Sequence, residues 1–259
     1  MINFDCHAHV FDKISVISGA RYIPKRPAPL DIWLQHQATH GLQGGVVVQP
    51  SFLGTDNSEL CAVLAKLDLR IFAGVAVVPM DISVEDLNEL VGKGIRGVRW
   101  NLVRGAELPH LDAAETQLFF SRLRARALHL EIHLEGSRLA PSLPQLLGQG
   151  VKVVLDHFGL PSDPDPKADP MIAAVQGISD RSALYFKFSA DYRTPFDVRP
   201  HADALRSLLP ADRVVWGSDW PHTQHENSVA FAETYGTEIL ARDLSDTIAA
   251  KALYGISAH

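Results

Sequence analysis

Short apolar runs recur along the chain, and each run stops at a polar residue, a glycine or a proline. They cover residues 2–7, 45–49, 72–78, 97–101, 130–134, 152–157, 184–189 and 214–219. Runs of this length, rich in Val, Ile and Leu, are typical of parallel strands that are buried on both faces. Their mean spacing is about 30 residues, which is the length of one strand-helix-strand unit. The pattern therefore predicts an α/β protein with eight strands in a (β/α)8 TIM barrel.

Segments with helical periodicity lie between these runs. Residues 83–91 place apolar side chains on one face, behind a Ser cap and ahead of two glycines that end the helix. Similar patterns predict helices over 30–42, 57–67, 113–128, 199–209, 229–240 and 245–253. The longest irregular stretches are 11–29 and 161–170. Each of them follows a predicted strand end, so we expect them to cover a site.

Length and composition favour one domain that spans residues 1–259. The chain has 46% hydrophobic residues, enough for one large core. Its formal net charge is -6, and no run of basic residues stands out, which argues against nucleic acid or an anionic membrane as the partner. We expect a small-molecule partner and either a monomer or a homo-oligomer.

The two cysteines bear on the compartment. Cys6 falls in a predicted strand and Cys61 in a predicted helix, so a disulfide framework is not expected. No signal-peptide pattern is present, and no apolar run reaches about 18 residues. The sequence therefore predicts a cytoplasmic protein.

Histidines and a carboxylate stand at the ends of the predicted strands. His7 and His9 close the first strand, and their i, i+2 spacing points both imidazoles to one face. His133, His157 and Asp219 end the fifth, sixth and eighth strands. The carboxyl ends of barrel strands meet at one pocket mouth, where ligands bind. A packed core gives no reason for this crowding of polar groups, so we predict an active site.

These five positions resemble the amidohydrolase superfamily, whose barrels carry His-x-His on strand one, His on strands five and six, and Asp on strand eight. The resemblance covers nearly the whole chain. Further motifs are similar to the branch of 2-pyrone-4,6-dicarboxylate hydrolases and the related sugar and muconolactone lactonases. They are Tyr-Ile-Pro at 22–24, Gln-Pro-Ser at 49–51, Gly-Val-Arg-Trp-Asn at 97–101, Asp-His-Phe-Gly at 156–159 and Trp-Gly-Ser-Asp-Trp-Pro-His at 216–222.

The resemblance leaves the metal content open. The end of the fourth predicted strand has no Lys of the kind that bridges two ions in binuclear members, so a two-metal site is not expected. Hydrolysis in the pyrone-dicarboxylate branch proceeds without a metal, as the resemblance implies, and no cofactor is expected. One Zn²⁺ or another divalent metal would nevertheless suit the set of His7, His9, His133 and Asp219.

Basic side chains gather at the fourth and seventh strand ends. A dicarboxylate needs fixed cations, and Arg offers a two-pronged donor for each carboxylate. Arg104 and Arg193 could instead form surface salt bridges, Lys187 could pair with an acidic neighbour in the barrel wall, and His222 could serve the loop. The predicted substrate-binding residues are Arg99, Asn101, Tyr22, Gln49, Ser51, His133, Lys187, Tyr192, Arg193 and His222.

The predicted function is hydrolysis of a lactone on a small anionic molecule, such as a pyrone dicarboxylate or a related lactone from aromatic-acid breakdown. Asp219 would act as general base on a water. His7, His9 and His157 would polarise the carbonyl and stabilise the oxyanion. An alternative is metal-dependent, non-oxidative decarboxylation within the same superfamily. A binding barrel without catalysis is disfavoured, because the His set and Asp219 are intact.

Overall fold

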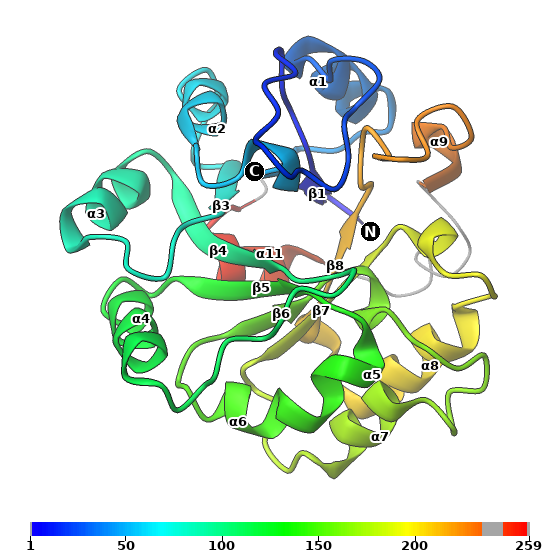
Figure 1. Cartoon of the computed structure of the whole chain (residues 1–259). Helices are drawn as coiled ribbons and strands as arrows, with labels where there is room; N and C mark the ends of the chain where they lie inside the picture. The colour runs from blue at the N-terminus through cyan, green and yellow to red at the C-terminus, as the bar shows by residue number, and fades with distance from the viewer. Residues whose placement is uncertain (1, 235–245, 258–259) are drawn as a thin grey trace.

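Eight parallel strands form one sheet, in chain order, in the computed structural model, which describes residues 2–234 and 246–257. They are β1 (Phe4–Ala8), β2 (Gly44–Val48), β3 (Phe72–Ala76), β4 (Ile95–Asn101), β5 (His129–His133), β6 (Val153–Leu155), β7 (Leu184–Ser189) and β8 (Val214–Gly217). Figure 1 shows them as a ring with helices outside. The predicted barrel is confirmed.

The sheet closes where the chain leaving β8 meets β1. The backbone N–H of Asp219 donates to the carbonyl of His7 at 2.8 Å, and the N–H of His9 donates to the carbonyl of Trp220 at 2.7 Å. These contacts join the two end strands of the sheet, and they set three of the predicted site residues next to one another.

Helices follow most strands. They are α1 (Leu30–Thr39), α2 (Ser58–Leu64), α3 (Val84–Gly92), α4 (Ala114–Arg124), α5 (Gly136–Leu139), α6 (Leu143–Leu147), α7 (Pro170–Gly177), α8 (Arg199–Leu208), α9 (Phe231–Thr234) and α11 (Asp246–Tyr254). Short 3-10 turns are η1 (Ser51–Leu53), η2 (Ala140–Ser142), η3 (His157–Gly159), η4 (Asp191–Arg193) and η5 (Ala211–Arg213). The predictions over 30–42, 57–67, 83–91, 113–128 and 199–209 match α1, α2, α3, α4 and α8.

The predicted helices missed two regions. Pro141 and Pro144 interrupt α5, η2 and α6, so no clean period appears there. No predicted helix covers α7, because it is largely apolar and begins at Pro170, inside the predicted loop. Asp169 caps α7 by accepting from the N–H groups of two residues in its first turn. The prediction over 229–240 contains α9, and its residues 235–240, like residue 245 of the last prediction, lie outside the described residues.

Two apolar cores hold the barrel. One lies between the strands and the surrounding helices, and the other fills the lumen with side chains of the strands and of α11. Ser257 N donates to the carbonyl of Arg70, ahead of β3, and the Lys152 ammonium donates to the carbonyl of Ala252, ahead of β6. α11 therefore closes the end where the strands begin, which leaves the carboxyl ends of the strands for the site.

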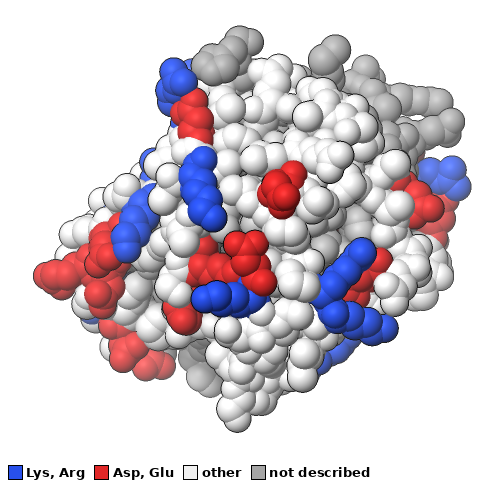
Figure 2. All heavy atoms as spheres, turned by 90° about the horizontal axis from the view of Figure 1, so that it is seen from above, with Lys and Arg blue, Asp and Glu red and all other residues white. Residues whose placement is uncertain are grey.

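The surface shown in Figure 2 carries acidic and basic side chains interspersed, with broad uncharged areas between them. A mixed surface of this kind does not create the one-sign field that recruits a polyanion. In the part of the chain that the structure describes, no helix combines the length and apolar character needed to cross a membrane.

Candidate active site

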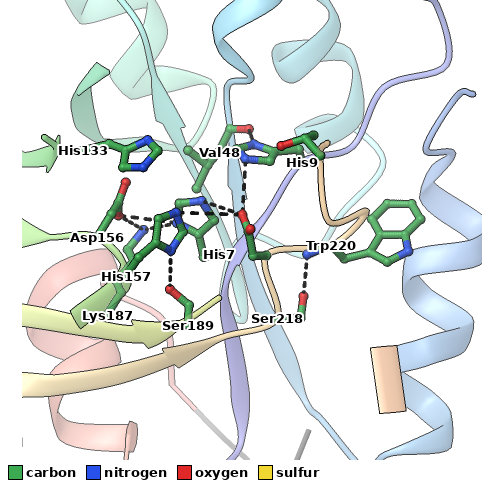
Figure 3. Close-up of polar contacts among 12 residues, drawn as sticks. His7, His9, Val48, His133, Asp156, His157, Lys187, Ser189, Ser218 and Trp220 are labelled. Atoms are coloured by element: carbon green, nitrogen blue, oxygen red, sulfur yellow. Dashed lines mark hydrogen bonds and ion pairs between the residues drawn. The ribbon is translucent and has the colours of Figure 1, made fainter. Parts of the chain in front are cut away.

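Three imidazoles surround one oxygen of Asp219 at the carboxyl ends of the strands. The Nε2 atoms of His7, His9 and His157 lie 3.6, 3.8 and 4.0 Å from Asp219 Oδ1. The ring of His133, at the end of β5, stands edge-on to His157 with centroids 4.8 Å apart. Figure 3 shows the four imidazoles gathered in one group. The structure thus brings together the five residues that the strand ends predicted.

The backbone at the β1–β8 seam aims these groups. Asp219 has φ 58°, in the left-handed region that few residues other than glycine adopt and that recurs at functional sites. A Cβ on Gly217 would lie 2.4 Å from the Cβ of His7, so glycine is required for β8 to approach β1 this closely. The pairing of β1 with β2 shifts register between Asp5 and Ala8, and such an irregularity re-aims the side chains beside it, here His7.

The two oxygens of Asp219 have different surroundings. Oδ2 accepts from the Tyr192 hydroxyl at 2.6 Å and from Arg193 Nε at 2.7 Å. Oδ1 has no hydrogen-bond partner among the described residues. Burial by itself raises the pKa of Asp219, but Arg193 and the nearby imidazoles outweigh it and hold this pKa well below its ordinary value. The site therefore presents an ionised carboxylate with one free oxygen.

Hydrogen-bond partners fix where His9 and His133 carry their protons. His9 Nδ1 lies 2.8 Å from the carbonyl oxygen of Val48, which can only accept, so the Nε2 of His9 turns a lone pair toward Asp219. Arg99 donates to His133 Nδ1 at 3.1 Å, so His133 carries its proton on Nε2. Burial is the main cause that lowers the pKa of His9 to about 3 and the pKa of His133 well below its ordinary value. Both rings are neutral near pH 7.

The lowered pKa of His9 should make the stability of the fold depend on pH. Its pKa is about 3 in the fold, against 6.5 as the ordinary value, so the unfolded chain binds the extra proton between these pH values. The free energy of unfolding should therefore fall as pH drops from 6.5 toward 3, by up to ~1.4 kcal/mol per pH unit from this group. Urea titrations across this range should show a flatter slope for His9→Gln. The exposed His110→Gln is the matched control, and equal slopes for the two variants would contradict the assignment.

A pocket of about 510 Å³, counting its open mouth, lies above this cluster. Its lining includes predicted site residues, namely Tyr22, Ser51, Arg99, Asn101, His133, Arg193, His9, His157 and Asp219. Arg21, Arg104, Thr223 and Gln224 also line it. The predicted covering loop 11–29 thus contributes Arg21 and Tyr22. The second predicted loop lines a neighbouring hollow through Pro161 and Ser162.

Other predicted site residues lie behind the pocket wall. Gln49 holds the following loop by donating to the carbonyl of Asp56 at 2.7 Å. Tyr192 supports Asp219, and the Nδ1 of His222 lies 3.4 Å from the Tyr192 hydroxyl. Lys187 is fully buried and donates to Glu131 at 2.6 Å, the ion pair that was the alternative for this residue. In this structure these four residues, like the fully buried His7, lie outside the pocket lining.

Two carboxylates that sequence reasoning did not assign organise the charges of the site. Asp156 accepts from Arg99 Nε at 2.8 Å, and Glu131 accepts from Lys187. Burial by itself raises the pKa of Glu131, but the Lys187 ammonium and the His129 hydrogen bond outweigh it and lower this pKa to about 2. The positions of these two carboxylates in the sequence could have identified them. Asp156 directly precedes His157, and Glu131 stands two residues before His133 on the same face of β5.

A metal ion in this site would have to be held by these donors. One atom each of His7, His157 and Asp219 lie within 4.8 Å of one another, so the positions are those of a possible ligand set. His9 and His133 of the predicted set are not in this group. His7 Nδ1, however, lies 3.1 Å from the Lys187 ammonium, which can only donate, so the Nε2 of His7 carries the proton and lacks the lone pair that a metal needs. With these protons in place, the set does not fit a metal.

The comparison with known proteins decides the family. The model of the amidohydrolase family matches residues 4–255, nearly the whole chain. The chain belongs to the amidohydrolase family. A 4-sulfomuconolactone hydrolase from Rhizobium radiobacter is 28% identical over 234 residues, which is 85% of this chain and 76% of that protein.

Solved structures agree with this family. A Pseudomonas putida protein designated as a candidate 2-pyrone-4,6-dicarboxylic acid hydrolase superposes with a TM-score of 0.87 at 33% identity, covering 99% of this chain and 98% of that one. A comparable candidate from Acinetobacter baumannii, crystallised with citric acid, gives a TM-score of 0.86 at 30% identity, covering 99% and 100%. The predicted resemblance of this amidohydrolase to the lactone-hydrolase branch is confirmed.

Proposed function

We propose that this amidohydrolase opens the ring of an anionic lactone by hydrolysis. The observation that carries the proposal is the free Oδ1 of the ionised Asp219, set among three imidazoles at the base of a pocket lined by four arginines. Relatives that hydrolyse lactones, by their names, support the same reaction class.

The proposed reaction begins with a water between Asp219 and the substrate. Oδ1 of Asp219 and the lone pair of His9 would accept its hydrogens, and its oxygen would attack the lactone carbonyl carbon. The carbonyl becomes an oxyanion, which nearby imidazole N–H groups would stabilise. The ring C–O bond then breaks and the leaving oxygen takes the proton held by Asp219. A carboxyl group with so low a pKa gives its proton back readily.

The cations of the pocket favour an anionic substrate. Arg99 and Arg193 are partly neutralised by Asp156 and Asp219. Arg21, by contrast, donates to neutral oxygens of Asn101, and Arg104 to the side chain of Gln224. Within residues 2–234 and 246–257, neither Arg21 nor Arg104 forms an ion pair. Partial burial, together with the charges of Arg104 and Arg99, lowers the pKa of Arg21. This direction indicates a positive potential in the pocket, which the carboxylate of a substrate would neutralise.

If Arg104 binds a carboxylate of the substrate, Arg104→Met should affect an anionic lactone more than an uncharged one. Loss of a charge-assisted contact of about 1.5–3 kcal/mol should raise KM for an anionic lactone about 10- to 100-fold. The KM of the same lactone with its carboxylates esterified should change little, because that substrate carries no charge to be held. Arg199→Met, which removes an exposed arginine paired with Asp197, is the control. Equal changes in KM for both substrates would show that Arg104 does not recognise the charge of the substrate.

A further inference from the structure

A buried ammonium lies directly behind the catalytic pocket. Lys187, on β7, is fully buried and its Nζ lies 2.6 Å from Glu131 Oε2, 3.1 Å from His7 Nδ1 and 3.7 Å from Asp156 Oδ1. An ammonium has three N–H groups and no lone pair, so it can only donate, here to Glu131 Oε2 and His7 Nδ1, while Asp156 Oδ1 lies beyond hydrogen-bond distance. Figure 3 shows Lys187 beneath His7 and His157, on the side away from Val48 and His9.

Glu131 is itself held in place from the closed end of the barrel. Its Oε1 accepts from the Tyr254 hydroxyl of α11 at 2.9 Å and lies 3.2 Å from His129 Nε2. Its Oε2 is thereby left for Lys187. All these side chains are buried, so the pair cannot rearrange toward water. The Lys187 ammonium is thus fixed in position by a network that does not touch the pocket.

The contact with Lys187 decides the proton of His7. A donor at 3.1 Å makes Nδ1 the acceptor, and a neutral imidazole then carries its proton on Nε2. That N–H points toward Asp219 Oδ1 at 3.6 Å, too far for a direct hydrogen bond, and neither atom has a partner among the described residues. His7 is fully buried and does not line the pocket itself, but its Nε2 faces the same Asp219 Oδ1 as the pocket-lining His9 and His157. A ligand oxygen that reaches this Oδ1 would therefore find a donor. His9, two residues away, presents the opposite tautomer.

We propose that Lys187, held by Glu131, is a positioning residue that makes His7 a hydrogen-bond donor to the substrate carbonyl and prevents it from acting as a metal ligand. The part about the carbonyl rests on the proposed lactone hydrolysis; the part about the tautomer does not. Binding a metal through Nε2 while Nδ1 accepts from Lys187 would require an imidazolate anion. The ammonium thereby suits a site that polarises the carbonyl by hydrogen bonds.

Asp156 determines which proton His7 would carry if the Lys187 ammonium were absent. Its Oδ1 lies 3.5 Å from His7 Nδ1 and has no hydrogen-bond partner among the described residues. Without the ammonium, Nδ1–H of His7 would donate to this carboxylate, and Nε2 would turn a lone pair toward Asp219. A carboxylate behind a histidine is the usual support of a metal ligand. Lys187→Met should therefore convert the positions of His7, His157 and Asp219 into a working metal site.

The first test is the tautomer of His7 in the unmodified protein. Nitrogen-15 NMR of the full chain with labelled histidine distinguishes the two tautomers by the shifts of the ring nitrogens, and the His7→Gln spectrum identifies the signals. We expect the proton on Nε2. A proton on Nδ1 would overturn the proposal, whether or not the protein hydrolyses lactones.

The second test compares variants by the same spectrum and by zinc titration. Lys187→Met should move the proton to Nδ1 and tighten zinc binding about 10- to 100-fold, the usual range for a change of support behind a ligand. Glu131→Gln keeps the volume and weakens the hold on Lys187, so it should shift both readouts in the same direction and supplies the test if Lys187→Met does not fold. Lys93→Met, which removes an exposed lysine, is the control. Unchanged tautomer and zinc affinity in the folded variants would overturn the proposal.

Discussion

Asp219→Asn is expected to lower kcat for lactone ring opening by about 10²- to 10⁴-fold, the range typical for a general base. The amide keeps the size of the side chain and can still accept from Tyr192 and Arg193 through its oxygen. It cannot take a proton from water at the position of Oδ1. KM should change much less than kcat, because Oδ1 faces the imidazoles and the attacking water while the arginines hold the substrate.

The control for this variant is Asp197→Asn. Asp197 is also paired with an arginine, Arg199, but on the surface and away from the pocket. Initial rates with saturating substrate, together with the melting temperature of each variant, separate loss of chemistry from loss of fold. If the Asp219→Asn enzyme is folded and its turnover is within a few-fold of the parent, Asp219 is not the general base.

Arg99→Met is expected to destabilise the protein by about 3–5 kcal/mol. Arg99 and Asp156 form an ion pair at 2.8 Å that is almost wholly buried, and removing one partner leaves the other charge without compensation in the interior. At about 2–4 °C per kcal/mol for a domain approaching this size, the melting temperature should fall by roughly 6–20 °C. Thermal unfolding followed by circular dichroism measures this directly.

Arg70→Met offers a comparison that differs mainly in burial. Arg70 pairs with Asp68 at 2.6 Å, but its side chain is 76% exposed, and exposed pairs contribute about 0–1 kcal/mol. A similar small loss for both variants would mean that the Arg99–Asp156 pair is not a structural element of the barrel. In that case Arg99 would be free for the substrate contact that its position at the end of β4 predicts.

The strand ends were the part of the site that sequence could predict. The carboxyl ends of parallel strands meet at one rim, so His7, His9, His133, His157 and Asp219 had to converge once the barrel was recognised. The partners of the cations could not be predicted in the same way. Pairing of Arg99 with Asp156 joins residues 57 positions apart, and depends on which side chains face each other across the lumen.

The histidine tautomers and the short helices were also beyond what the sequence could predict. The tautomers of His7 and His9 follow from Lys187 and the carbonyl of Val48, which contact them only in the folded barrel. Helix α7 shows no amphipathic period in the sequence because apolar Ala173 and Ala174 stand between its buried residues, and the prolines at 141 and 144 obscure the period of α5 and α6. Local patterns therefore defined the scaffold, whereas contacts between distant strands define the chemistry.

Ring opening in water labelled with oxygen-18, after exhaustive chelation, shows whether Asp219 activates a water that attacks the carbonyl carbon of an anionic lactone. Mass spectrometry of the product from the parent enzyme and from Asp219→Asn follows the label. We expect the parent enzyme to place one oxygen-18 atom in the new carboxylate and to leave the oxygen of the leaving hydroxyl unlabelled, and we expect the variant to form almost no product. Label in the leaving hydroxyl, release of carbon dioxide in place of ring opening, or activity that vanishes on chelation and returns only with added metal would contradict this mechanism.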